Sequence, residues 1–160
     1  MARALELIGD WWTPLILRDL FLGVNRFDGL AEDLGVSRNL LTRRLKALEE
    51  NHVILRRAYQ DRPKRYEYAL TEAGRDLVPI LLALTAWGDR WAQPDEGAPI
   101  LFRHKSCGRF FEPRLVCRAC GEPVRAEDID ALPGPGGAPT PGTKLVARLL
   151  AGRRTAKEGD

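Results

Sequence analysis

The sequence predicts a mainly α-helical domain with one small β-hairpin, followed by a small module that carries all of the cysteines. Two observations predict the domain. Apolar residues recur at helical spacing in several segments up to about residue 92, and one pair of strand-like runs surrounds a proline-containing turn. The third observation is that all 3 cysteines fall close together beyond residue 100.

The composition is typical of a soluble globular protein. The chain has 160 residues, of which 44% are hydrophobic and 29% charged, enough for one domain and a small satellite. No apolar run approaches the ~20 residues that a membrane-spanning helix needs, and the first residues lack the layout of a secretory signal. We therefore expect a cytoplasmic protein without a membrane partner.

Capping residues and glycines predict the first helices. A short helix is expected over residues 3–9. Thr13 as N-cap, with Pro14 at the first helical position, predicts a second helix that ends near Gly23. A third is expected over residues 27–34, before a glycine.

The next predicted helix is amphipathic. Ser37 is a good N-cap, and the helix should run from about residue 38 to residue 51. Leu41, Leu45 and Leu48 fall on one side at helical spacing. The opposite side is rich in hydrogen-bond donors and carries Asn39, Thr42, Arg43 and Lys46.

A basic β-hairpin and a long helix follow. Strand-like runs at 55–59 and 65–70 flank a turn with Arg62, Lys64 and Arg65 at its tip. Thr71 then caps a helix that reaches about residue 92. Its apolar stripe is too long to stay uncovered and consists of Leu77, Ile80, Leu81, Leu84, Trp87 and Trp91.

This order of elements is typical of a winged helix-turn-helix, which binds double-stranded DNA. A helix about 10–12 Å wide fits the major groove, and a basic hairpin tip suits the adjacent minor groove or its phosphates. A basic helix face or a basic turn alone is usually only solvated surface; their combination in this order favours DNA. The expected DNA-binding residues are Ser37, Arg38, Asn39, Thr42, Arg43, Lys46, Arg62, Lys64 and Arg65.

Several blocks of the sequence resemble the HxlR-type family of bacterial winged-helix regulators, which is related to the MarR group. The matching blocks lie, in order, at residues 7–13, 15–20, 26–30, 41–49 and 66–74. The resemblance covers about residues 2–92 and implies a dimeric DNA-binding transcriptional regulator.

The resemblance also implies that the dimer forms through the first helix and the last long helix. For most of the apolar residues on these helices, packing inside one chain is at least as well supported as a place in the dimer interface. Trp11 stands where the family often has a polar residue, and we expect it to pack inside the protein or to line an effector pocket. The residues that fit the dimer interface are Leu5, Ile8, Leu77, Leu81, Leu84, Trp87 and Trp91.

Two ligand pairs with the spacing of zinc knuckles follow, His104-x2-Cys107 and Cys117-x2-Cys120. A glycine follows the second ligand of each pair, where the chain must turn around a metal. Cys3His is a donor set that zinc prefers, and about 27 residues bury too little surface to fold alone. The segment thus resembles a zinc ribbon with a structural zinc; a redox thiol pair at Cys117 and Cys120, or inert thiols, are the alternatives.

The predicted organisation has four parts. A winged helix-turn-helix domain for DNA binding and dimerisation covers residues 1–92, and a linker covers 93–99. The zinc-ribbon-like module covers 100–126, and a flexible basic tail covers 127–160.

The leading functional prediction is a homodimeric, sequence-specific transcriptional regulator that acts as a repressor on a pseudo-palindromic operator and responds to a small-molecule effector. No phosphate loop, nucleotide-binding fingerprint or nucleophilic triad supports an enzyme. Two alternatives stay open. The chain could be a winged-helix and zinc-ribbon interaction module of the transcription machinery, or a metal or redox sensor that acts through its cysteines.

Overall fold

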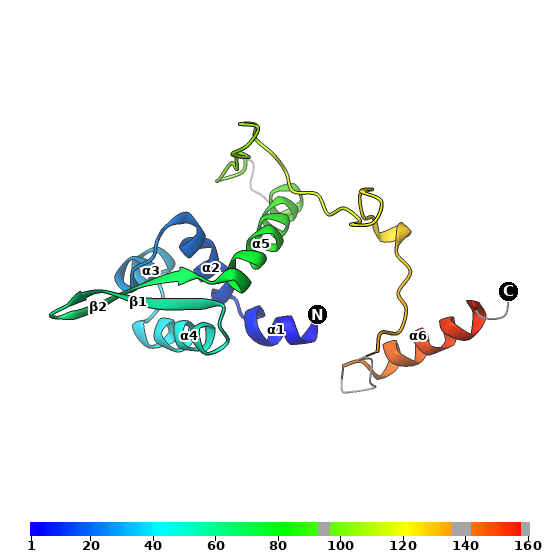
Figure 1. Ribbon diagram of the computed structural model, residues 1–160, viewed down its shortest axis with the longest axis horizontal. Coiled ribbons are helices and arrows are strands. Elements are labelled where there is room, and N and C mark those ends of the chain that lie inside the picture. Colours follow the sequence, from blue (N-terminus) through cyan, green and yellow to red (C-terminus); the bar gives the residue numbers. More distant parts are fainter. Residues whose placement is uncertain (93–96, 136–141, 158–160) are drawn as a thin grey trace. The chain divides into compact units, whose positions relative to one another are not determined.

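The computed structural model describes residues 1–92, 97–135 and 142–157, and is drawn in Figure 1. The chain divides into two compact units, Met1–Pro113 and Arg114–Asp160, each of which is considered by itself. Among the described residues, no helix has the length and apolar character needed to cross a membrane.

The first unit confirms the predicted mainly helical fold with one hairpin. Helices α1, α2, α3 and α4 precede strands β1 and β2, and the long helix α5 follows them. The bounds are α1 Ala2–Ile8, α2 Trp12–Leu22, α3 Phe27–Leu34, α4 Arg38–Glu50, β1 Ile54–Asp61, β2 Lys64–Leu70 and α5 Glu72–Trp91.

The start of α2 differs from the sequence prediction. Thr13 was expected to be the N-cap, but the helix begins at Trp12 and Thr13 is buried inside its first turn. The capping group is the Asp10 carboxylate, which accepts hydrogen bonds from the backbone N–H of Trp12 at 2.9 Å and of Thr13 at 3.1 Å. The Thr13 hydroxyl also donates to this carboxylate. The carboxylate thus satisfies N–H groups that a helix start leaves unpaired.

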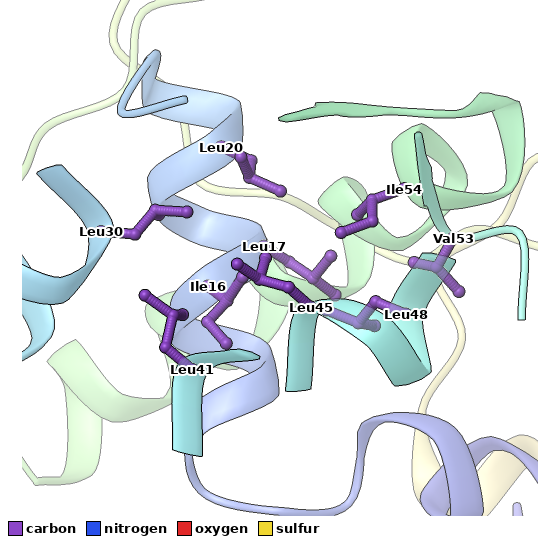
Figure 2. Close-up of a cluster of buried hydrophobic side chains, with 9 residues drawn as sticks. All are labelled: Ile16, Leu17, Leu20, Leu30, Leu41, Leu45, Leu48, Val53 and Ile54. Carbon is purple, nitrogen blue, oxygen red and sulfur yellow. The ribbon is translucent and has the colours of Figure 1, made fainter. Parts of the chain in front are cut away.

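The core of the first unit lies between α2, α4 and the base of the hairpin. Leu41, Leu45 and Leu48, the predicted apolar side of α4, are at most 2% exposed. The Ser37 hydroxyl accepts a hydrogen bond from the backbone N–H of Leu40 at 3.3 Å, which confirms the predicted cap. Figure 2 shows the whole cluster: Ile16, Leu17, Leu20, Leu30, Leu41, Leu45, Leu48, Val53 and Ile54.

The hairpin is antiparallel and longer than the sequence predicted. Its register runs from Ile54 opposite Leu70 to Asp61 opposite Lys64. Strand β1 contacts α4, and β2 contacts α2, α3 and α5. Figure 1 shows the hairpin projecting from the helices toward its turn, with α4 alongside.

Helix α5 begins with the predicted cap and packs on α2. The Thr71 hydroxyl accepts a hydrogen bond from the backbone N–H of Gly74 at 3.2 Å. Leu77 and Leu81 are half-buried against the core. Gly74 allows a close approach, because a Cβ at this position would lie 2.2 Å from the carbonyl oxygen of Val53.

The residues beyond α5 contain little regular structure. The described elements of the second unit are a short 3-10 helix at Ala126–Asp128 and α6 at Lys144–Lys157. The predicted 100–126 module therefore has its first half in one compact unit and its second half in the other. The predicted flexible tail contains the helix α6.

Gly74→Ala should destabilise the first unit by about 1–3 kcal/mol, because an added methyl group meets a backbone carbonyl that has little room to move. Thermal or urea unfolding followed by circular dichroism measures the change. Gly88→Ala is the matched control in the same helix, since no atom lies within 4 Å of its added Cβ. The control should not lose stability. An equal loss in both variants would contradict the assigned role of Gly74.

Asp10 should make stability depend on pH in the acid range. Partial burial raises its pKa, but the hydrogen bonds from Thr13 and Trp12 and the nearby Arg44 outweigh burial and lower the pKa below its ordinary value. A lowered native pKa means that the carboxylate stabilises the fold above about pH 3.9. That contribution is lost as the pH falls through the native pKa.

Asp10→Asn should therefore be less stable than the wild type near neutral pH, and the difference should shrink as the pH falls below about 4. Urea unfolding at a series of pH values measures it. Asp76→Asn, at an exposed position of α5, controls for the change in net charge. A difference that stays constant with pH would contradict this assignment.

Candidate nucleic-acid interface

The polar side of α4 faces away from the core, as the sequence predicted. Asn39, Thr42, Arg43 and Lys46 are all exposed, as are Ser37 and Arg38 at the start of the helix. The same helix buries its leucines, so its rotation about its own axis is fixed. The exposed side therefore offers a row of donors and positive charges at a helix surface.

Arg38 is held in place by residues of α3. Its guanidinium group pairs with the Asp28 carboxylate at 2.7 Å and lies 4.7 Å from the centre of the Phe27 ring. Both charged side chains of the pair are more than two-thirds exposed. The pair thus contributes little to stability, but it orients the guanidinium at the start of α4.

The other α4 side chains differ in how far they are already paired. Lys46 is 3.6 Å from the Glu50 carboxylate one turn later, and the Thr42 hydroxyl donates to the carbonyl oxygen of Arg38 at 2.7 Å. Within the described part of the chain, neither Asn39 nor Arg43 has a side-chain hydrogen bond or an ion pair. These two side chains keep all of their donors for a ligand.

The hairpin tip presents the three predicted cations to solvent. Arg62, Lys64 and Arg65 are exposed, and Lys64 lies 5.7 Å from the centre of the Tyr66 ring. Within the described residues, no ion pair neutralises any of the three. The tip is therefore a concentrated positive charge on the same compact unit as α4.

Sequence reasoning missed the residues that connect the hairpin to α4. Arg56 of β1 pairs with Glu49 of α4 at 3.6 Å and lies 4.4 Å from the centre of the Tyr66 ring. Arg26 adds another exposed cation and stacks on Tyr59 at 4.6 Å. No local pattern marks these contacts, because each joins residues of different elements.

The structure divides the predicted dimer residues into two groups. Ile8, Leu77 and Leu81 are partly buried against the core of their own chain. The others project from α1 and α5, where Ile80 joins them at 55% exposed. The exposed members of the prediction are Leu5 at 55%, Leu84 at 57%, Trp87 at 60% and Trp91 at 67%.

The expectation that Trp11 packs inside the protein is wrong, because its side chain is 77% exposed. The adjacent Trp12 packs against the core instead. A hollow of about 120 Å³ lies between α2 and α5, which is small for a drug-sized ligand. A wider, open hollow of about 670 Å³ is lined by the end of α5 and residues 98–113.

The predicted metal ligands lie at two tight turns. His104 and Cys107 belong to the first compact unit, and Cys117 and Cys120 to the second. Backbone hydrogen bonds from Cys120 and Ala119, with the Cys120 side chain, outweigh desolvation and lower the pKa of the Cys117 thiol. Within the described part of the chain, no three His, Cys, Asp or Glu side chains are gathered closely enough to hold a metal ion.

The chain is similar to known transcriptional regulators. Residues 7–96 match the HxlR-like helix-turn-helix family. The chain is 48% identical to an uncharacterised HTH-type transcriptional regulator of Mycobacterium tuberculosis over 136 residues, which cover 85% of this chain and 86% of that protein. It is 33% identical to the HTH-type transcriptional regulator YodB of Bacillus subtilis, over 60% of this chain and 87% of YodB.

Solved structures show the same relationship. PA1607, a protein proposed to be a transcription factor, matches with a TM-score of 0.71 and 32% identity, over 81% of this chain and 91% of PA1607. The reduced form of YodB matches with a TM-score of 0.51 and 34% identity, over 59% of this chain and 93% of YodB. The relatives are regulators rather than enzymes, which confirms the prediction that this chain is not an enzyme.

Proposed function

Because the chain belongs to the HxlR-like helix-turn-helix family of transcriptional regulators, we propose that it is a homodimeric repressor that binds a pseudo-palindromic operator. One observation carries this proposal. Helix α4 buries its leucines and exposes its donor-rich side, on a unit whose hairpin tip is positively charged. That combination matches what a major groove and its flanking phosphates require.

In this proposal α4 is the recognition helix. Asn39 and Arg43 read base edges, since their donors are free and their side chains favour adenine and guanine respectively. Lys46 and the hydroxyl of Thr42 add contacts to bases or phosphates. Arg38, oriented by Asp28, and the N-terminal end of α4 at Ser37 bind a phosphate.

The hairpin provides the second contact. Arg62, Lys64 and Arg65 reach the minor groove or the backbone beside the groove that α4 occupies. Phosphate contacts of this kind fix the register of a protein on DNA, whereas base contacts specify the sequence. Two copies related by a two-fold axis would place their recognition helices about one helical turn of DNA apart. A dimer seated on a promoter represses by excluding other proteins from that DNA.

The proposed dimer interface is the apolar side of α1 and α5. Leu84, Trp87 and Trp91 are all more than half exposed in the isolated chain. An uncovered row of large apolar side chains favours association. Ile8, Leu77 and Leu81 lie on the same helices, but they pack against the core of their own chain. They therefore hold the helices that carry the exposed residues.

A small-molecule effector would act by favouring one geometry of the dimer over another. The open hollow beside the end of α5 is within the size range of ligand pockets. It adjoins the same helix as the proposed interface, so a ligand there would alter the spacing of the two recognition helices.

Arg43→Ala and Lys64→Ala test the DNA-binding surface. A duplex enriched from a random library by the wild-type chain serves as the probe, and fluorescence anisotropy at several salt concentrations measures binding. Arg43→Ala should cost about 1–3 kcal/mol and relax the preference for one base position. Lys64→Ala should weaken binding to all sequences alike and reduce the salt dependence by about one counterion.

Arg75→Ala is the control, because it removes an exposed arginine near the start of α5, where the guanidinium donates to the carbonyl oxygen of Leu70 at the end of β2, away from the hairpin tip. It should bind the selected duplex as the wild type does. Failure of the wild type to enrich any sequence would exclude sequence-specific binding. A variant carrying both Arg43→Ala and Lys64→Ala that still binds normally would contradict the proposed surface.

Leu84→Glu tests the dimer. A charge placed in the proposed apolar interface should halve the molar mass measured by light scattering after size exclusion, while the helical content stays unchanged. Leu101→Glu makes the same change at an exposed leucine outside α5 and should leave the mass of the wild type. A Leu84→Glu chain that remains a dimer would place the interface elsewhere.

A further inference from the structure

The open hollow beside the end of α5 combines aromatic and charged side chains. Its volume is about 670 Å³, and all of its lining residues belong to the first unit. The phenylalanines that line it are Phe102, Phe110 and Phe111. The charged residues that line it are Asp89, Arg90 and Glu112. Small-molecule sites usually have an apolar lining with a few polar groups, and these groups decide which class of molecule fits.

Backbone pairing holds the phenylalanines together. The backbone N–H of Phe111 donates to the carbonyl oxygen of Phe102 at 3.1 Å, and a bridge joins Arg103 and Phe110. The Phe111 ring also meets the His104 ring in an edge-to-face arrangement, with 5.8 Å between the ring centres. Phe110 is 69% exposed although it lines the hollow. Aromatic rings bind flat apolar molecules and also attract cations, because the face of each ring carries a partial negative charge.

The two carboxylates of the hollow lack a cationic partner. Within the part of the chain that the structure describes, neither Asp89 nor Glu112 has a hydrogen bond or an ion pair. Asp89 is half-buried, and a carboxylate that loses water without gaining a partner raises the free energy of the fold. The guanidinium of Arg90 lies over the Trp91 ring, 5.0 Å from the ring centre. The described lining thus carries more negative than positive charge, next to aromatic rings.

The hollow and the proposed dimer interface lie on different sides of α5. Leu82, Ala86 and Asp89 line the hollow, whereas Leu84 and Trp87 belong to the exposed row of the interface. The two rows are offset by two residues, which corresponds to about 200° around a helix. A ligand in the hollow therefore contacts α5 without displacing a second copy from the interface.

We propose that this hollow binds a lipophilic organic cation, a molecule with a flat aromatic body and an ammonium group, and that this cation is the effector. The aromatic body packs against the phenylalanines, and the ammonium group lies beside the carboxylates of Asp89 and Glu112. Binding supplies the half-buried carboxylate with a partner, which a neutral or anionic molecule does not do. The role as effector rests on the proposed function, because it requires a DNA affinity that the cation can change, whereas the binding site does not.

Isothermal titration calorimetry of the full-length chain tests the site with three probes that share one ring system. The probes are the naphthylmethyl-trimethylammonium cation, the neutral naphthylmethanol and the anionic naphthylacetate. One cation per chain should bind, about tenfold more tightly than the alcohol, and the anion should bind most weakly. Asp89→Asn and Glu112→Gln should each weaken binding of the cation about three- to tenfold and leave binding of the alcohol unchanged. Phe110→Ala should weaken binding of both.

Asp76→Asn is the matched control, since it removes an exposed carboxylate of α5 that does not line the hollow. It should bind the cation as the wild type does. Fluorescence anisotropy of the enriched duplex, with and without saturating cation, measures the effector role. The cation should weaken DNA binding of the wild type about fivefold or more, but not that of a variant with both Asp89→Asn and Glu112→Gln. This comparison separates a cation bound in the hollow from one bound to DNA phosphates.

Equal affinity for the three probes, or tightest binding of the anion, would overturn the proposed class of ligand. A chain that binds its duplex but not the cation would overturn this inference alone, and a cation that binds without changing the DNA affinity would overturn its role as effector. A chain that binds the cation but enriches no duplex would contradict the proposed function while supporting the site. Circular dichroism of each variant shows whether the helices of the first unit have formed.

Discussion

Burial of one side of α4 is the constraint on which the first unit depends. Leu41, Leu45 and Leu48 are almost inaccessible to solvent and join the residues of α2 and the base of β1 in a single core. A helix presents its two sides in opposite directions, so burying the leucines exposes Asn39 and Arg43. Rotating the helix by half a turn would bury a charged guanidinium without a partner, at a cost that the core could not offset.

Contacts between elements then set the shape of the surface. The Arg56–Glu49 pair joins the hairpin to α4, and the Asp28 carboxylate orients Arg38. Exposed pairs such as these add little to the free energy of unfolding, but they restrict where the guanidinium groups lie. A surface that binds DNA gains from such order, because less side-chain freedom is lost on binding.

The segments after α5 are held together by different interactions from those of the helical domain. The helical domain is held by apolar burial, whereas residues 102–111 and 115–124 each form a tight turn held by backbone hydrogen bonds beside a glycine with positive φ, Gly108 or Gly121.

The sequence by itself determined the elements whose signals are local: the caps at Ser37 and Thr71, the bounds of α3, the hairpin and the apolar side of α4. Asp10 rather than Thr13 caps α2, a local contact that the sequence pattern did not single out. Only the tertiary structure decided that Leu77 packs inward while Leu84 of the same stripe stays exposed. Periodicity gives the direction of a side chain on its own helix, but burial depends on which neighbour lies opposite, and that neighbour comes from a distant part of the chain.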